Sequence, residues 1–291
     1  INDIAHNPKM SVPMPMLNVL NGGQHATNSS DFQEYMVVPT KATTYREAIQ
    51  ITAEIFATLK KVLHDKGFPT TVGDEGGFAP EVSSNTQMLD LLTDACAAAG
   101  YTPGTDIHFA LDVAASEFFV HKKYELKTEG KSLTPTEMID YLADMAKTYP
   151  IVSIEDGLSQ NEWSSWTKQS KKLPDIQLVG DDLLVTTQDR LQKAIDEKAG
   201  NAILIKLNQI GSLTETVKTI NLAKENNWNT IVSHRSGETE DVTITHLAVG
   251  TGAGQIKTGS VSRGERTAKH NELMRIEDRA KELTLANPFT T

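Results

Sequence analysis

The sequence has little of several features that define common protein classes. It contains one cysteine, Cys96, among 291 residues, so no disulfide can form within the chain. It has no apolar run near ~20 residues, the length that a helix needs to cross a bilayer. Basic residues are also in the minority, because 28 Lys and Arg stand against 38 Asp and Glu, giving a formal net charge of −10. These deficits predict no membrane span and argue against a nucleic-acid partner.

Other absences concern the organisation of the chain. No low-complexity stretch, long linker or internal sequence repeat divides it, so we predict one domain over residues 1–291. No signal peptide is recognisable, and Cys96 lies in a small-residue helical segment typical of a buried structural thiol, so we expect a cytoplasmic protein. The chain begins with Ile1 rather than Met and leads straight into strand-like sequence, from which we expect a fragment of a longer protein.

Apolar runs that end in a charged residue recur along the chain. The run 107–112 is typical of a buried parallel strand and ends in Asp112, and similar runs end in Glu155, Asp181 and Lys206. A single acid in such a place could cap a helix or join a surface ion pair. Several carboxylates at buried strand ends cost free energy unless a cation or a catalytic task uses them. We therefore expect these residues to share one site.

The spacing of the runs predicts the fold. Six strands, each followed by a helical stretch, are expected near 107–112, 151–155, 176–181, 202–207, 229–234 and 254–257. Two strands and then two helices are expected before them, over 12–19, 32–38, 45–65 and 86–99. The order ββαα(βα)6 predicts a closed TIM-like α/β barrel, in which functional side chains gather at the C-terminal strand ends. A small hairpin over 118–128 is expected as an insertion.

A glycine-flanked acidic loop covers residues 73–80. Gly76 and Gly77 permit backbone conformations that present Glu75 to a cleft. By itself this pattern is a weak indication of function.

A second loop, 233–241, follows a strand and opens a helix. Its backbone N–H groups, the helix dipole and Arg235 could face an anion, and phosphate is the natural ligand for such a set. The alternative for Arg235 is a surface salt bridge to Glu238 or Asp241.

Together these motifs resemble the C-terminal barrel domain of the enolase family, the glycolytic phosphopyruvate hydratases. The resemblance covers nearly the whole chain, and ββαα(βα)6 is the order of enolase barrels. One departure is Gly157, which follows Glu155 and Asp156 where many relatives carry proline. The blocks that carry the resemblance are 17–25, Gln33-Glu34, 72–77, 110–112, 153–156, Asp181-Asp182, 205–211, 233–241 and 255–259.

The resemblance implies an activity, a cofactor and catalytic roles. Enolases dehydrate 2-phosphoglycerate reversibly to phosphoenolpyruvate with Mg²⁺, which prefers hard oxygen ligands. Asp112, Glu155 and Asp181 match the metal ligands of the family. Lys206 matches the base that removes the C2 proton, and Glu75 matches the acid that protonates the leaving hydroxyl.

Further matches imply substrate contacts. Lys257 matches the residue that helps to neutralise the substrate carboxylate, and with Mg²⁺ it is expected to disfavour the protonated form of Lys206. The alternative for His25 is a cap on a Gly-Gly turn. The residues assigned to substrate binding are His25, Gln33, Glu34, His234, Arg235, Ser236 and Lys257.

The resemblance also implies partners and leaves two alternatives. Family members are commonly homodimers, and their N-terminal domain carries a loop that closes over the substrate, so we expect the barrel alone to turn over slowly. A different superfamily enzyme acting on an acid sugar would share the metal-binding acids, but it would have no reason to carry the 233–241 loop or Glu75. Enolases are also reported as plasminogen receptors in a surface or secreted pool, although the lysine usually invoked for this is not at the end of the sequence, which is Thr291.

Overall fold

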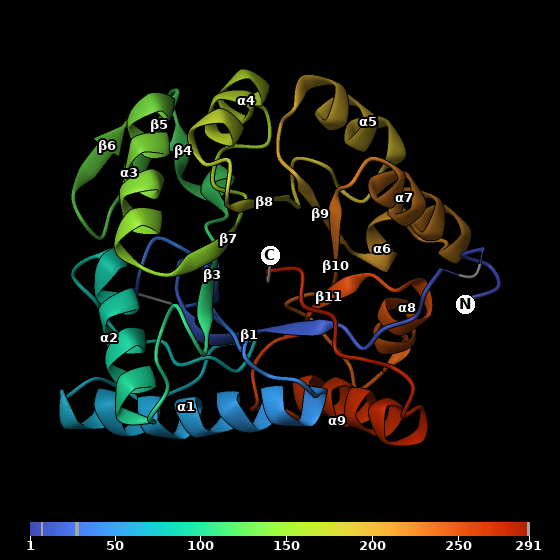
Figure 1. Cartoon of the computed structure of the whole chain (residues 1–291). Helices are drawn as coiled ribbons and strands as arrows, with labels where there is room; N and C mark the ends of the chain where they lie inside the picture. Colours follow the sequence, from blue (N-terminus) through green and yellow to red (C-terminus); the bar gives the residue numbers. More distant parts are fainter. Residues whose placement is uncertain (7, 27–28, 290–291) are drawn as a thin grey trace.

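The computed structural model describes residues 1–6, 8–26 and 29–289. Within them, eight strands close a barrel (Figure 1). The strands follow one another around it in the order β1 (Met14–Asn21), β11 (Gly254–Lys257), β10 (Asn229–Ser233), β9 (Ala202–Ile205), β8 (Gln177–Gly180), β7 (Ile151–Glu155), β3 (His108–Asp112) and β2 (Glu34–Val38). β2 is antiparallel to both of its neighbours, β1 and β3, and the other neighbouring pairs are parallel.

Helices form a ring outside the barrel (Figure 1). They are α1 (Tyr45–Asp65), α2 (Asn85–Ala98), α3 (Pro135–Thr148), α4 (Trp163–Lys172), α5 (Gln188–Glu197), α6 (Leu207–Ile210), α7 (Leu213–Glu225), α8 (Thr243–Thr251) and α9 (Gly264–Arg279). Two strands and two helices precede six strand-helix units, so the predicted order ββαα(βα)6 is confirmed.

Local sequence signals explain where several helices begin and end. At α3, Thr134 and Glu137 form a reciprocal capping box, with Pro135 at the first helical position. The Ser212 side chain accepts the Glu215 N–H at the start of α7. Gly252 caps the C-terminus of α8 with a left-handed φ of 57°, a conformation that costs little free energy for glycine.

The insertion after β3 is larger than the predicted hairpin. Beyond a short 3₁₀ turn, η2 (Ala115–Phe118), it forms an antiparallel three-stranded sheet of β4 (Phe119–Val120), β5 (Lys123–Leu126) and β6 (Lys131–Leu133). The prediction of a hairpin ending at 128 was therefore too short. The third strand escaped notice because its three residues, with one partly buried position, carry little periodic signal.

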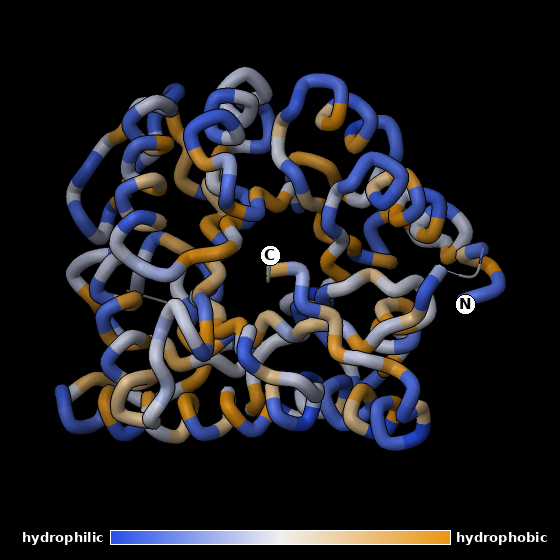
Figure 2. The backbone as a smooth tube through the Cα atoms, viewed as in Figure 1, coloured by the Kyte–Doolittle hydropathy of each residue, from blue (hydrophilic) through white to orange (hydrophobic). Residues whose placement is uncertain are grey.

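The core has two layers. One lies between the barrel and the helices, and it contains Cys96, whose burial raises the pKa of its thiol to about 12, as expected for a structural cysteine. The other includes side chains such as Met14, Met36 and Ile231, against which Phe289 packs from the end of the chain. In Figure 1 this C-terminal segment lies at the centre of the barrel, and Figure 2 shows apolar residues along the barrel strands.

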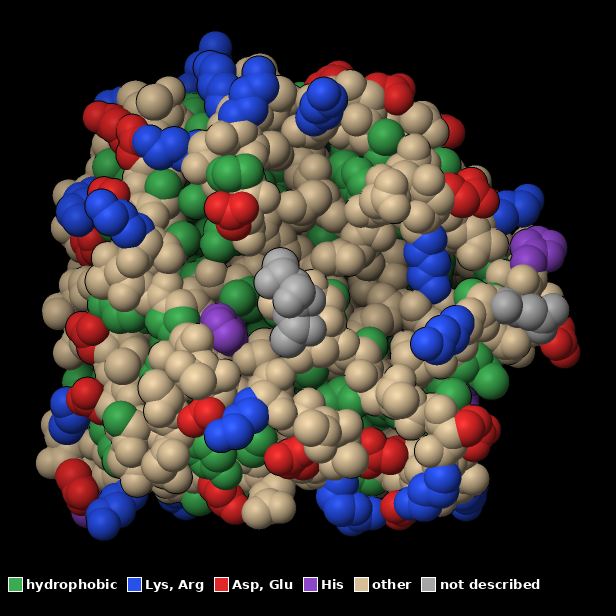
Figure 3. All heavy atoms as spheres, in the orientation of Figure 1, with side chains coloured by type: hydrophobic (Ala, Val, Ile, Leu, Met, Phe, Trp, Pro, Cys, Tyr) green, Lys and Arg blue, Asp and Glu red, His purple; other side chains and the backbone are tan. Residues whose placement is uncertain are grey.

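The described surface carries mixed charge. Acidic and basic side chains are interspersed over the face shown in Figure 3. Among the helices of the described residues, none is long and apolar enough to cross a membrane, as the sequence predicted.

Candidate active site

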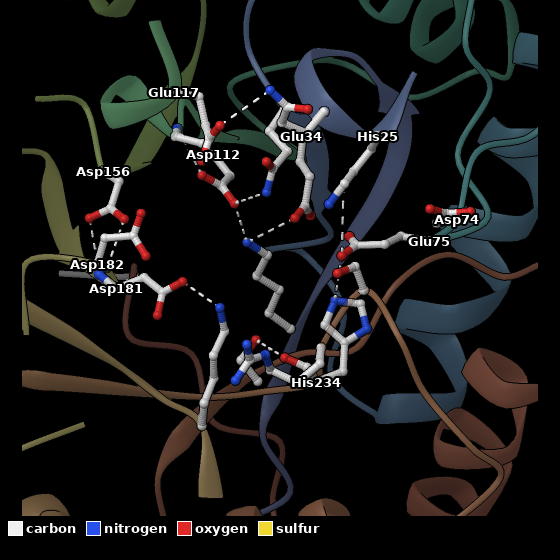
Figure 4. A pocket seen from close by; sticks show the side chains of 18 residues that line it. His25, Glu34, Asp74, Glu75, Asp112, Glu117, Asp156, Asp181, Asp182 and His234 are labelled. Atoms are coloured by element: carbon white, nitrogen blue, oxygen red, sulfur yellow. Dashed lines mark hydrogen bonds and ion pairs between the residues drawn. The ribbon is translucent and has the colours of Figure 1, made fainter. Parts of the chain in front are cut away.

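A polar cavity of about 380 Å³ lies at the C-terminal ends of the barrel strands (Figure 4). Glu155 is the one predicted site residue outside its lining, because it is buried behind Asp112 and Lys257. The predicted residues that line the cavity are His25, Gln33, Glu34, Glu75, Asp112, Asp181, Lys206, His234, Arg235, Ser236 and Lys257.

Lys257, the last residue of β11, connects the ends of three neighbouring strands. Its Nζ lies 3.1 Å from Glu34 Oε1, 2.8 Å from Asp112 Oδ2 and 2.9 Å from Glu155 Oε2. The strand register brings these acids together, since Asp112 pairs with both Glu34 and Glu155. Burial lowers the pKa of Lys257, but the neighbouring acids Asp112, Glu155 and Glu34 raise it more, so the net pKa is well above its ordinary value. Lys257 is therefore an ammonium ion.

A compact acidic set lies beside this cluster. Oxygens of Asp156, Asp181 and Asp182 lie within 4.8 Å of one another. Asp181 belongs to the predicted metal-binding set, whereas Asp112 and Glu155 bind Lys257 instead of completing the compact set. Figure 4 shows these three aspartates on one side of the cavity.

The acidic side of the cavity fits a divalent cation. Among the described residues, no group hydrogen-bonds to the buried Glu155 Oε1. The pKa of Glu155 is well above its ordinary value because burial and then Asp112 raise it more than Lys257 lowers it. Burial, Asp181 and Asp182 likewise raise the pKa of Asp156. Close carboxylates with unsatisfied oxygens are the donor set that a hard cation would stabilise.

Asp156 has a positioning role that the sequence did not reveal. Its backbone is left-handed, with φ of 42°. Its carboxylate accepts the N–H of Asp181 at 3.1 Å and that of Asp182 at 2.8 Å. The signal in the sequence was the pair of doublets, Glu155-Asp156 and Asp181-Asp182, in which the second acid received no role.

Lys206 follows β9 and contacts Asp181. Its Nζ donates a hydrogen bond to Asp181 Oδ2, and Gln209 Nε2 donates to Asp181 Oδ1 at 3.1 Å. Burial lowers the pKa of Lys206, but Asp181 and Glu155 raise it more, so the net pKa is above the ordinary value. The protein side chains alone therefore favour the protonated form of Lys206. The neutral amine expected from the sequence requires a metal cation that binds Asp181 in place of Lys206.

Glu75 lies on the opposite side of the cavity from Asp181 (Figure 4). Asn18 Nδ2 donates to Glu75 Oε2 at 3.1 Å. His234 Nε2 lies 3.4 Å and His25 Nδ1 3.8 Å from Glu75 Oε1. Burial raises the pKa of Glu75, but His234, followed by His25 and Lys257, lowers it further, so the net pKa is well below the ordinary value. Glu75 is therefore ionised in this structure.

Glu34 has the opposite shift. Burial, and next the charge of Glu75, raise its pKa well above the ordinary value, with Lys257 opposing. Of the two carboxyls, Glu34 is therefore the one whose surroundings favour the protonated form.

The predicted need for glycine backbone conformations holds for Gly76, and close packing also requires glycine at both 76 and 77. Gly76 has φ of +86°, and a Cβ there would lie 2.5 Å from Ser262 Oγ. A Cβ on Gly77 would lie 2.6 Å from Asn21 Oδ1. The loop therefore holds Glu75 in one place.

The 233–241 loop differs in part from its prediction. α8 begins at Thr243, beyond the loop, and Asp241 itself accepts the Thr243 N–H at 2.8 Å, so the helix N-terminus is capped by the chain. Arg235 Nη1 donates to Asn208 Oδ1 at 3.2 Å, and its backbone N–H donates to Glu238. Within the described chain, no carboxylate pairs with the Arg235 guanidinium. The alternative of a surface salt bridge is therefore not seen there, and the exposed guanidinium is available to an anion.

A comparison with family models gives one match, described as the enolase C-terminal TIM barrel domain, over residues 9–287. The chain belongs to the enolase family. The match spans every residue that lines the cavity, and an enolase barrel domain implies binding of a small-molecule substrate.

Proposed function

We propose that this enolase barrel carries the active site for reversible dehydration of 2-phosphoglycerate to phosphoenolpyruvate. The observation that supports the proposal most directly is that Lys206, which contacts Asp181, lines the same cavity as the carboxyl pair of Glu34 and Glu75. Glu75 lies across this cavity from Asp181 (Figure 4). Elimination of water needs a base for the C2 proton and an acid for the departing hydroxyl, and these groups supply both.

Mg²⁺ is the proposed cofactor, with Asp181 as the central ligand and Asp112, Glu155, Asp156 and Asp182 within the same acidic region. When bound, it would stabilise negative charge on the substrate carboxylate as the C2 proton is lost, as in other enolase-superfamily sites. Lys206 would lose its carboxylate partner and become a better base.

Charge on the cavity wall supports a phosphorylated substrate. Within the described residues, the Arg235 guanidinium has no carboxylate partner, and Ser236 and His234 line the same cavity. An acid-sugar substrate would offer no phosphate to this guanidinium. Lys257 would hold the substrate carboxylate, and His25 and Gln33 line the same cavity. Homodimer formation, a cytoplasmic location and plasminogen binding stay predictions.

The test is exchange of the C2 proton of 2-phosphoglycerate with solvent deuterium, followed by NMR over hours with Mg²⁺. This measurement also detects slow turnover. The 291-residue chain and Lys218→Ala, which changes an exposed lysine on α7, should exchange the proton, whereas Lys206→Ala should not. A wild-type chain that neither binds nor exchanges 2-phosphoglycerate would contradict the proposal.

A further inference from the structure

We propose that Arg266 is a positioning residue that fixes the tautomer of His234 and directs its Nε2–H at Glu75. The catalytic consequence rests on the proposed function, whereas the tautomer does not. Arg266 lies in the first turn of α9, outside the barrel, and does not line the cavity.

Arg266 is buried and nearly saturated with hydrogen bonds. It is 1% exposed. Its Nη1 lies 2.7 Å from His234 Nδ1 and donates to Arg235 O at 2.8 Å. Its Nη2 donates to Asp74 O at 3.0 Å and to Ser236 O at 2.7 Å. One guanidinium therefore joins the Glu75 loop to the loop after β10.

The chemistry of the guanidinium determines where the His234 proton lies. Arginine has N–H donors and no acceptor, so His234 Nδ1 must accept. The ring proton is then on Nε2, which lies 3.4 Å from Glu75 Oε1. An imidazolium would place Nδ1–H against a guanidinium, so His234 is held neutral. Burial, which lowers the pKa of His234, acts in the same direction.

The backbone makes room for this arrangement. Gly259 has φ of +81°, and a Cβ there would lie 2.6 Å from Arg266 Cδ and 2.9 Å from Glu75 O. The Arg266 side chain thus passes through space that any other residue at 259 would fill. The absence of a side chain at Gly259 also lets the backbone of Glu75 approach it closely.

A second buried cation on α9 shows what is specific to Arg266. Lys269 donates to Thr239 O at 2.5 Å and pairs with Glu238 Oε2 at 2.6 Å. It steadies the loop after β10, but the structure gives it no contact with a side chain of the cavity. A purely structural Arg266 would resemble Lys269 and would leave the His234 tautomer unchanged when replaced.

The first experiment reads the tautomer in the intact protein. Histidine is labelled with ¹⁵N, and long-range ¹H–¹⁵N spectra distinguish a protonated from an unprotonated ring nitrogen. His234 is identified by the signals that His234→Gln removes. We expect neutral His234 with the proton on Nε2 at neutral pH. A proton on Nδ1, or on both nitrogens, overturns the proposal whatever the activity.

The second experiment uses Arg266→Gln and Arg266→Lys, with Arg275→Gln as matched control, since Arg275 is an exposed arginine on the same helix. Arg266→Gln should give mixed tautomers and lower kcat for phosphoenolpyruvate formation about 10- to 100-fold with little change in KM. Arg266→Lys can still donate to Nδ1, so it should keep the tautomer and recover part of kcat. Arg275→Gln should match wild type.

The outcomes separate the two proposals. Wild-type tautomer and kcat in folded Arg266→Gln would overturn the positioning role. If that variant does not fold, the wild-type spectrum and Arg266→Lys decide, and loss of the tautomer in Arg266→Lys with unchanged kcat overturns it. A wild-type protein with the expected tautomer and no reaction with 2-phosphoglycerate would instead contradict the proposed function.

Discussion

The pKa values of Glu34 and Glu75 shift in opposite directions, although both carboxyls are fully enclosed in the same wall of the cavity. Glu75 faces His234 and His25, whereas Glu34 has the charge of Glu75 beside it. Of the two, Glu34 therefore binds a proton more readily, next to the site where the proposed reaction expels hydroxide.

Amide substitutions should tell the two members of the pair apart. Glu34→Gln replaces the carboxyl whose pKa is raised by a neutral group of the same shape, so the free energy of unfolding at neutral pH should change by less than about 1 kcal/mol. Glu75→Gln removes a charge that its neighbours stabilise and should cost about 1–3 kcal/mol. Urea unfolding measures both values. Equal losses would show that Glu34 is not the carboxyl that favours the protonated form.

Replacing the proposed base and replacing the proposed acid should affect different kinetic steps. Lys206→Ala should abolish exchange of the C2 proton, whereas Glu75→Gln should slow dehydration more than exchange, because the carboxyl pair acts when hydroxide leaves. NMR follows exchange, and absorbance follows phosphoenolpyruvate. If both variants lose exchange equally, base and acid are not separate groups.

Asp181→Asn should weaken Mg²⁺ binding about 10-fold or more, because Asp181 is the member shared by the predicted metal-binding set and the compact acidic set. Isothermal titration with Mg²⁺ and a substrate analogue measures the affinity. Asp189→Asn, at an exposed position of α5, is the control. Unchanged affinity in Asp181→Asn would reject Asp181 as a ligand.

Acid should destabilise the fold partly through His270. This side chain is 3% exposed, and its burial lowers the pKa from 6.5 to about 4. Between these values the unfolded chain binds a proton that the folded protein does not, so stability falls as pH falls through this window, by about 3 kcal/mol in full.

His270→Gln should therefore flatten the dependence of unfolding free energy on pH between about 6.5 and about 4. The replacement also loses the contact of His270 Nδ1 with Tyr45 Oη at 2.8 Å, so the slope and not the absolute stability is compared. His64→Gln, which changes an exposed histidine of α1, serves as control. An unchanged slope in His270→Gln would exclude this histidine as a source of acid sensitivity.

The barrel could be predicted from the sequence because buried parallel strands are short apolar runs, and their spacing sets the strand order. The gathering of Asp112, Glu155 and Asp181 could be predicted from the same spacing, since the strand ends of a barrel meet at one mouth. Partner choice within the mouth could not be predicted. Whether Asp112 contacts a metal ion or the ammonium of Lys257 depends on strand register and side-chain direction, which the periodicity of the sequence does not encode.

Arg266 was missed for a different reason. α9 has a polar sequence typical of a solvated helix, yet Arg266, Lys269 and His270 on it are all buried. Their partners are largely backbone carbonyls of distant loops, such as Asp74 O and Thr239 O, and no sequence pattern marks these.

The apolar layer inside the barrel, closed by Phe289, has a consequence for the field at the mouth. Beneath the ammonium of Lys257 and its carboxylates lie the buried, mutually hydrogen-bonded side chains of Ser153, Gln177 and Gln255, and then the apolar layer. Water and salt therefore cannot screen these charges from below. Solvent therefore reaches these charges from the open mouth of the cavity. A substrate that fills the mouth displaces this solvent as well. Each charge then acts on the bound molecule at the low dielectric of the protein interior.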